Sequence, residues 1–551
     1  MLHAILFKGT FQDSVTLMIL SRDLSALPNV KRVSVMMGTP ANKDVFRETG
    51  LWNDTLAAAA PNDLCIVVDS DEEDAAVVEG VAAQVRERLA KLARGSRKTL
   101  YPVARSWRRV KELMPKANLA LISVPGQYAA GLARQALEGG CHAMIFSDNV
   151  GLDEELELKT MARERGLLVM GPDCGTAIVG GAPLAFANRI PAGPIAVVGA
   201  SGTGIQEITS QIARLGGGVS HALGLGGRDL SERIGGLSAA TALDFVARDE
   251  GVRIIAFVSK QPAPAVRDKI LAMMQKLGKP VVALFLGGRP SRRDLGNVHL
   301  ARTLDEAAAL AVELAEIETQ VASIRGVAGR GICGLYTGGT LAGEAAQLLA
   351  EALDLSPDEG HADGYMLHTG QHRIIDLGDD VYTRGRPHPM IDPFMRNQMI
   401  EELSSDPAVG VLLVDVVLGF GGHADPAGEL ARAVTGMKAK RTDIAVIATV
   451  TGTPQDPQGG DKQAQILEDA GIIIAGSVRA AILLAVRAVV GEAASPGQQP
   501  PLLSAAPEVV NIGLKGFAND LSGNGIKVVH YHWEPVSEGS ERLRALAASL
   551  L

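Results

Sequence analysis

Short runs of apolar residues alternate with longer amphipathic stretches over most of the chain. Between about 116 and 325, each apolar run is followed by a stretch whose apolar positions recur with helical spacing. The runs read LALISVP, CHAMIFS, GLLVMGP, GPIAVVGA, VRIIAFVS and KPVVALFLGG. Strands that alternate with helices at this spacing predict right-handed βαβ units and parallel sheets.

The same alternation resumes after residue 330, and shorter versions of it stand at both ends of the chain. A stretch rich in Pro, Gln and Ser near 492–508 is typical of a linker. We predict an α/β fold with several doubly wound parallel sheets. The expected parts are an N-terminal α/β domain with a basic linker, a Rossmann-like domain, two flavodoxin-like domains, and a linker with a small C-terminal βαβ segment. Their ranges are 1–110, 111–190, 191–328, 329–495 and 496–551.

The composition excludes several classes of protein. The chain has 551 residues, 47% hydrophobic and 21% charged, as in ordinary globular proteins. Aromatic residues make up only 4%, which argues against a nucleic-acid surface built on base stacking. No apolar run reaches the ~18 residues of a membrane span, and the N-terminus lacks the features of a signal peptide. We therefore expect a cytoplasmic protein that binds neither nucleic acid nor membrane.

The residues that could bind metal do not form a convincing site. The four cysteines, Cys65, Cys141, Cys174 and Cys333, lie far apart in or beside apolar runs, which favours small buried side chains over disulfides or zinc ligands. Two His/Asp pairs have the spacing of ligands on one helix turn, His372 with Asp376 and His388 with Asp392. Three prolines interrupt the second pair, and the first lies in a predicted strand. We predict no metal site.

A basic segment of ten Lys and Arg residues covers positions 86–111 of this otherwise acidic chain, whose net charge is −9. Such a run could bind an anion or an acidic partner. It could equally be a solvated helix followed by a linker.

A glycine-rich turn follows the predicted strand GPIAVVGA and opens a helix. It contains Ser201, Gly202, Thr203 and Gly204. Glycines expose backbone N–H groups, the hydroxyls add donors, and the N-terminus of a helix favours an anion. The turn is therefore a candidate phosphate site, although such turns also serve only for packing.

A second turn of this kind follows the strand VGVLLVDVVL and contains Gly421, Gly422 and His423. His423 could donate to a phosphate oxygen, carry a proton or become phosphorylated; a helix-capping or surface histidine is the alternative. If the two units pack face to face, both helix N-termini would meet at one phosphate. The loop Thr451–Gln458, which contains Thr453, is either a substrate-covering loop or a plain connector.

Residues 116–320 resemble the alpha subunit of succinyl-CoA synthetase. The segment LALISVPGQYAAGLARQALEGGCHAMIFSDNVG and the turn Gly171–Gly175 are similar to that family's CoA-binding strand–helix pair and its Gly-Pro-Asn-Cys turn. GPIAVVGASGTGIQEI is similar to its Ser-Gly-Thr turn, from which one of two phosphate-facing helices starts. Residues 330–495 resemble the C-terminal ligase domain of the beta subunit. The whole order of motifs resembles the FdrA family of acyl-CoA-synthetase-like proteins.

The departures from the synthetases concern the residues that carry the chemistry. The family's phosphohistidine loop is replaced by Gly287–Asp294, which has no histidine, and the glutamate that holds the phosphohistidine is replaced by the sequence around Lys260. No glycine-rich CoA turn precedes ANLALISV, and no segment resembles the nucleotide-binding half of the beta subunit. The resemblance therefore makes CoA doubtful as a cofactor and argues against ATP-driven synthesis by this chain alone.

The FdrA resemblance implies carbamoyl transfer between phosphate and oxalurate-like ureido compounds, as in purine (allantoin) catabolism. Phosphate or carbamoyl phosphate would be a substrate, held by the turns at Ser201–Gly204 and Gly421–His423. Lys260 and Arg289 would neutralise its charge, and His423 would carry the proton. Asp173, Cys174 and Thr453 are candidate substrate contacts.

Two other functions stay open at this point: a component of an NDP-forming acyl-CoA synthetase, in which His423 would carry phosphate, and a non-catalytic scaffold or metabolite sensor. The C-terminal segment VVNIGLKGFANDLSGNGIKVVHYHWEP resembles a segment of the DUF1116-type proteins encoded beside FdrA relatives; a small accessory domain is the alternative. We expect an oligomer that contains a DUF1116-type partner and possibly a further subunit.

Overall fold

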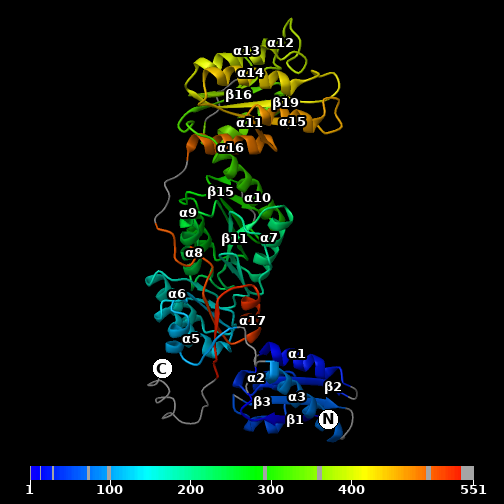
Figure 1. Ribbon diagram of the computed structural model, residues 1–551, viewed down its shortest axis with the longest axis vertical. Coiled ribbons are helices and arrows are strands. Elements are labelled where there is room, and N and C mark those ends of the chain that lie inside the picture. The colour runs from blue at the N-terminus through cyan, green and yellow to red at the C-terminus, as the bar shows by residue number, and fades with distance from the viewer. Residues whose placement is uncertain are drawn as a thin grey trace.

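The computed structural model describes residues 2–10, 12, 14–27, 30–61, 63–70, 75–95, 101–288, 294–355, 363–491 and 498–534. Four sheets follow one another along the longest axis, from the N-terminal domain at one end to the second flavodoxin-like domain at the other (Figure 1). The predicted α/β class with parallel-dominated sheets is confirmed.

The N-terminal sheet differs from the others because it is antiparallel. Its central strand β3 pairs antiparallel with both β1 and β2. Helix α2 lies between β2 and β3 in the chain, and β3 inserts between the two earlier strands. Apolar side chains cover both faces, with Leu24 and Val85 on one and Phe46 and Leu56 on the other. The elements are β1 (Leu2–Phe7), α1 (Ser14–Ser25), β2 (Val30–Met37), α2 (Pro40–Glu48), β3 (Leu64–Ser70) and α3 (Ala75–Gly95).

The second sheet is wholly parallel and has the Rossmann strand order, β4-β23-β22-β5-β6-β7. The second and third strands in that order, β23 and β22, come from near the C-terminal end of the chain, and they pair with β4 and β5 respectively. The segment expected as a separate unit at 496–551 thus completes the domain that starts near residue 101. The strands are β4 (Val103–Ala104), β5 (Leu119–Ile122), β6 (His142–Ile145), β7 (Val169–Met170), β22 (Val509–Ile512) and β23 (Val528–Tyr531). The helices are α4 (Trp107–Leu113), α5 (Gly126–Glu138), α6 (Leu152–Glu164) and α17 (Lys515–Gly523).

The third sheet is flavodoxin-like, with parallel strands in the order β11-β10-β12-β13-β15. Antiparallel additions flank it, and the hairpin at residues 176–185 belongs to this sheet instead of the domain expected at 111–190. The strands are β8 (Thr176–Val179), β9 (Ala182–Ala185), β10 (Ile195–Ala200), β11 (Val219–Gly224), β12 (Ile254–Ser259), β13 (Val281–Phe285), β14 (Asp294–Leu295) and β15 (Val298–Ala301). The helices are α7 (Gly202–Arg214), α8 (Leu237–Arg248), α9 (Pro264–Met274) and α10 (Leu304–Val321).

The fourth sheet repeats this plan, with parallel strands in the order β18-β16-β19-β20-β21 and an antiparallel edge strand β17. The strands are β16 (Gly331–Tyr336), β17 (Tyr365–Thr369), β18 (His372–Asp376), β19 (Val409–Val417), β20 (Ala445–Thr451) and β21 (Ile473–Ala475). The helices are α11 (Gly339–Leu353), α12 (Asp380–Thr383), α13 (Phe394–Glu402), α14 (Pro426–Lys440), α15 (Gly460–Asp469) and α16 (Val478–Val490).

The two flavodoxin-like domains pack through α10 of the first and α11 and α16 of the second. One apolar cluster runs across this interface and includes Leu314 of α10 and Leu484 of α16. Ion pairs close its margin, Arg479 with Glu313 at 2.7 Å and Arg487 with Glu318 at 2.6 Å. The interface therefore resembles the interior of a domain more than a loose contact.

A buried group of charges joins the Rossmann-like domain to the first flavodoxin-like domain. Lys159 of α6 lies 2.9 Å from Glu155 and 2.8 Å from Asp229, which follows β11. Arg228 lies 2.8 Å from the other oxygen of Glu155. Asp229 also accepts the backbone N–H groups of Ser238 and Ala239 at the start of α8.

Candidate functional site

The Ser201 turn lies at the carboxyl edge of the third sheet, where β10 and β12 are neighbours. Ala200 is in register with Ser259, so the residues after both strands lie side by side. Ser201 Oγ accepts the N–H of Gly204 at 3.2 Å and fixes the start of α7. A Cβ on Gly204 would lie 2.9 Å from that hydroxyl, which accounts for the glycine. The N–H groups of Gly202 and Thr203, at the helix N-terminus, can meet an anion.

Lys260 follows β12 directly and is exposed, so its backbone lies beside the Ser201 turn, at the point where the strand order reverses. In an open α/β sheet this reversal is the usual ligand position. Gly287, after β13, lies near Gln261, which brings a third turn to the same edge. Arg289, the second predicted cation, lies outside the described residues.

The Asp173–Cys174 turn packs against the end of β11. A Cβ on Gly226 would lie 2.2 Å from the carbonyl oxygen of Pro172, so the two backbones are in direct contact. Cys174 is 2% exposed, and burial raises the pKa of its thiol to about 12. Cys174 therefore fills the interior as a thiol. Asp173 is exposed at a positive φ of 59° and faces Gly227.

The second turn is held by hydrogen bonds from two other loops. The side-chain amide of Gln458 accepts the N–H of Gly419 at 3.1 Å and donates to the carbonyl oxygens of Gly419 and His423. The N–H of His423 donates to the carbonyl oxygen of Met390 at 2.8 Å. That N–H is therefore unavailable to the phosphate that we expected it to hold, and the anion-binding amides left in this turn are those of Gly421 and Gly422.

The imidazole of His423 is half-buried, and a neighbouring backbone group sets the tautomer of the neutral ring. Its Nδ1 accepts the backbone N–H of Asp425 at 3.1 Å. An accepting Nδ1 carries no proton, so the neutral ring has its proton on Nε2. His423 thus presents a hydrogen-bond donor.

Asp425 places a negative charge at the start of α14. Its carboxylate accepts the N–H of Gly428 at 3.2 Å and the amide of Gln463 at 3.0 Å. The bond from Gln463 is the main cause that lowers the pKa of Asp425. The helix is already capped by its own carboxylate, so its dipole attracts a phosphate less than the sequence suggests.

Thr453 is exposed in the loop after β20 and donates its N–H to Asp456 at 2.6 Å. The same loop carries Gln458, so it positions the His423 turn. Among the described residues, no hydrogen bond or ion pair joins this turn to the Ser201 turn. Their convergence on one phosphate stays a prediction.

A third polar group, which we did not predict, lies where β16 and β19 are neighbours in the fourth sheet. Asp415 is buried and accepts the N–H groups of Thr337 and Gly338 at 2.7 and 2.8 Å. Burial raises its pKa. Asp376, at the end of β18, and His388 lie at the same edge. The sequence signal for Asp415 was one charged residue inside an apolar strand, which also fits a structural carboxylate.

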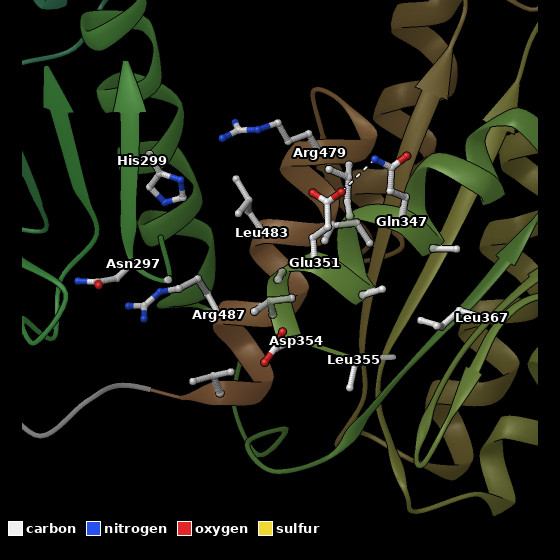
Figure 2. Close-up of a pocket in the computed structure, with 18 of the residues that line it drawn as sticks. Asn297, His299, Gln347, Glu351, Asp354, Leu355, Leu367, Arg479, Leu483 and Arg487 are labelled. Atoms are coloured by element: carbon white, nitrogen blue, oxygen red, sulfur yellow. Dashed lines mark hydrogen bonds between the residues drawn. The ribbon is translucent and has the colours of Figure 1, made fainter. Parts of the chain in front are cut away.

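A cavity of about 1060 Å³ lies between the two flavodoxin-like domains, and the residues of the two glycine-rich turns do not line it. Figure 2 shows Asn297 and His299 on one wall, α16 with Leu483 and Arg487 in the middle, and Gln347 and Glu351 on α11 beyond it. No predicted site residue lines it.

Two further results concern metals and membranes. The described ranges contain no group of three His, Cys, Asp or Glu side chains placed to hold a metal ion. Across the same ranges, no helix combines the length and hydropathy needed to cross a membrane.

Three protein-family models match the chain. The model for CoA-ligase covers residues 335–488, and the model for the CoA binding domain covers residues 192–287. The model for AllF, heavy metal-associated domain, covers residues 1–102. That part contains one cysteine, Cys65, and one histidine, His3. Burial raises the pKa of Cys65 to about 11, so these residues do not fit the thiolate site that a soft metal ion requires.

The chain is also similar in sequence to curated proteins. The chain is 39% identical to the uncharacterized protein YahF of Escherichia coli, over 85% of this chain and 95% of that protein. It is 26% identical to subunit alpha 1 of a succinate–CoA ligase from Archaeoglobus fulgidus, over 31% of this chain and 59% of that subunit. Among solved structures, a dinucleotide-forming acetyl-coenzyme A synthetase of Ca. Korarchaeum cryptofilum is 16% identical, covers 69% of this chain and 84% of its own, and has a TM-score of 0.43.

Proposed function

The chain belongs to the FdrA-like family of acyl-CoA-synthetase-like proteins, and from this premise we propose that it is a subunit of an enzyme that transfers a carbamoyl group between phosphate and a ureido compound. The Ser201 turn with Lys260 binds the phosphoryl group. His423 exchanges a proton with the reacting atoms. A DUF1116-type partner supplies the rest of the site.

The observation that carries this proposal is the state of His423. A histidine that takes up a phosphoryl group on Nε2 needs a free lone pair there, whereas an Nδ1 that accepts the N–H of Asp425 leaves the neutral ring a donor at Nε2. The sequence at Gly287–Asp294, where the synthetases have their phosphohistidine, contains no histidine. Direct transfer to or from phosphate needs a donor and a proton carrier, and both are present.

In the proposed reaction a phosphate oxygen attacks the ureido carbonyl carbon, and the bond from that carbon to the substituted nitrogen breaks. His423 gives its Nε2 proton to the leaving nitrogen while the proton of the attacking phosphate takes its place on Nε2. The products are carbamoyl phosphate and a primary amide such as oxamate. Lys260 and the amides of Gly202 and Thr203 offset the phosphoryl charge without reorganisation, which is the usual large contribution to such transfers.

The test measures phosphate release from carbamoyl phosphate and oxamate, by the chain alone and with its DUF1116-type partner, without ATP and CoA. We expect turnover, and we expect His423→Gln to lower it by about 100-fold because glutamine donates a hydrogen bond but carries no proton. The matched control is His368→Gln, at an exposed position on β17. Undiminished turnover in His423→Gln contradicts the proposed role.

A component of an ADP-forming acyl-CoA synthetase is the second candidate, and the named relatives support it more directly than the first. They include succinate–CoA ligase alpha subunits and an ADP-forming sulfoacetate-CoA ligase subunit. The expected absence of a CoA turn needs revision, because β22 and α17 supply the first strand–helix turn of the Rossmann-like sheet. Gly513, Lys515 and Gly516 would hold CoA phosphates there, and CoA would supply the thiol that accepts the acyl group.

The same assay separates the two candidates. Turnover that begins only when ATP and CoA are added, with a phosphoenzyme that disappears in His423→Ala, supports the synthetase component. A folded chain without turnover in either mixture supports the scaffold or sensor.

A further inference from the structure

The loop 384–393 carries a histidine that the proposed reaction does not use. His388 stands between Pro387 and Pro389, whose rings restrict the backbone on both sides. Its Nδ1 accepts the N–H of Met390 at 3.2 Å, the arrangement seen at His423, so its proton also resides on Nε2. The carbonyl oxygen of Met390 accepts the N–H of His423. The two imidazoles are thus tied to each other through one residue.

Asp376 lies beside this histidine at the end of β18. Its Oδ1 accepts the N–H of Gly378 at 2.8 Å. Its Oδ2 lies 2.6 Å from the position that a Cβ on Gly339 would take, at the start of α11. Within the described part of the chain, Asp376 makes no ion pair.

The distance between the two side chains is bounded by Gly378. The position that a Cβ would take on this glycine lies 3.0 Å from Asp376 Oδ1 and 3.1 Å from His388 Nε2. The two atoms are therefore at most about 6 Å apart, close enough for one small group to form a hydrogen bond with each of them. A donor and an acceptor separated in this way match a small group that has both an acceptor and a donor.

We propose that Asp376 and His388 form a subsite that binds a primary amide or ureido group of the substrate. His388 Nε2–H donates to the carbonyl oxygen, and the Asp376 carboxylate accepts from the amide N–H. Phosphate is an anion that the Asp376 carboxylate repels, so this subsite is distinct from the phosphate position at the Ser201 turn. The assignment rests on the proposed function for its substrate class.

The test compares three probes by calorimetry on the full chain with its partner: oxamate, which has an amide; oxalate, which has a carboxylate in its place; and inorganic phosphate. The variants are Asp376→Asn and His388→Gln, with Asp380→Asn as the matched control, an exposed carboxylate four residues along the same segment. Circular dichroism confirms that each variant is folded.

We expect the unsubstituted protein to bind oxamate more tightly than oxalate. Asp376→Asn and His388→Gln should each bind oxamate about tenfold more weakly, because each loses one charge-assisted hydrogen bond. Phosphate affinity stays unchanged in all three variants. The subsite is overturned if the unsubstituted protein binds oxalate as tightly as oxamate, or if oxamate binding is absent or insensitive to both substitutions. Failure of the proposed function differs, because it appears as the absence of turnover from carbamoyl phosphate.

Discussion

Two pairs of histidines in this chain differ in how deeply they are buried. His142 and His530 lie inside the Rossmann-like sheet, 4% and 3% exposed, and burial lowers the pKa of each to about 4. His388 and His423 are half-buried at the edge of the fourth sheet, where a backbone N–H fixes the tautomer of each. The first pair affects stability and the second pair is available for binding.

A loss of stability in mild acid follows from the buried pair. The unfolded chain takes up protons at these histidines near pH 6.5, whereas the folded chain does not until about pH 4, so stability is full above about pH 7 and falls as the pH drops through this window. At pH 5 each histidine lowers the free energy of unfolding by about 2 kcal/mol. Urea unfolding followed by the fluorescence of Trp107 and Trp533, both in this domain, measures the change.

The substitution His142→Gln should reduce the difference between pH 7 and pH 5 by about 2 kcal/mol. His368→Gln, at an exposed position, should leave it unchanged. An unaltered pH profile in His142→Gln would show that this imidazole does not control the acid sensitivity.

Residue patterns predicted correctly that a helix opens at the Ser201 turn, because the start of a helix depends on neighbours in the sequence. They could not show that the N–H of His423 is taken by Met390, which is 33 positions away. They also could not place Asp376 beside His388, because the loop between them folds back by contacts that no local pattern records. Interactions between distant residues account for these misses.

At the scale of elements, the alternation of apolar runs and amphipathic stretches predicted most strands and helices of the parallel sheets. It did not predict which strands pair, because a buried parallel strand has the same apolar character wherever it lies in the sheet. The strand β22 illustrates this: all four of its residues are buried, which suits a central position, yet its place near the C-terminus suggested an accessory unit. The antiparallel N-terminal sheet was missed for the same reason.

The central position of β22 predicts a large effect of a small substitution. Ile512 is fully buried between β5 and β23, so Ile512→Ala should lower the free energy of unfolding by about 2–5 kcal/mol. The matched control is Val103→Ala on the edge strand β4, where the side chain is 45% exposed and the expected loss is below about 1 kcal/mol. Urea unfolding monitored by tryptophan fluorescence compares the two. Equal losses would contradict a central role for the C-terminal segment.

At the scale of the whole molecule, the first flavodoxin-like domain contacts the Rossmann-like domain on one side and the second flavodoxin-like domain on the other. Both contacts are of a kind that fixes the relative orientation of the domains. On one side, Lys159 is buried between Glu155 and Asp229, and separating them would leave charges without partners. On the other side, the apolar cluster through α10 and α16 is continuous, and two ion pairs close it. The three units from residue 101 onward should therefore move as one body.

If these units move as one body, the distance between the two glycine-rich turns is fixed. Spin labels can be placed beside them in the variant Gln261→Cys/Ala424→Cys, since both positions are exposed. The native cysteines should not react, because all four are buried and burial raises the pKa of each thiol.

Pulsed electron paramagnetic resonance should give one narrow distance between the labels, unchanged by inorganic phosphate. A shift on addition of phosphate, or two distances, would contradict the rigid body and indicate a hinge between the flavodoxin-like domains. With a fixed distance, the two turns can share one phosphate only if they are already within its reach. A longer distance assigns them to two separate anion sites.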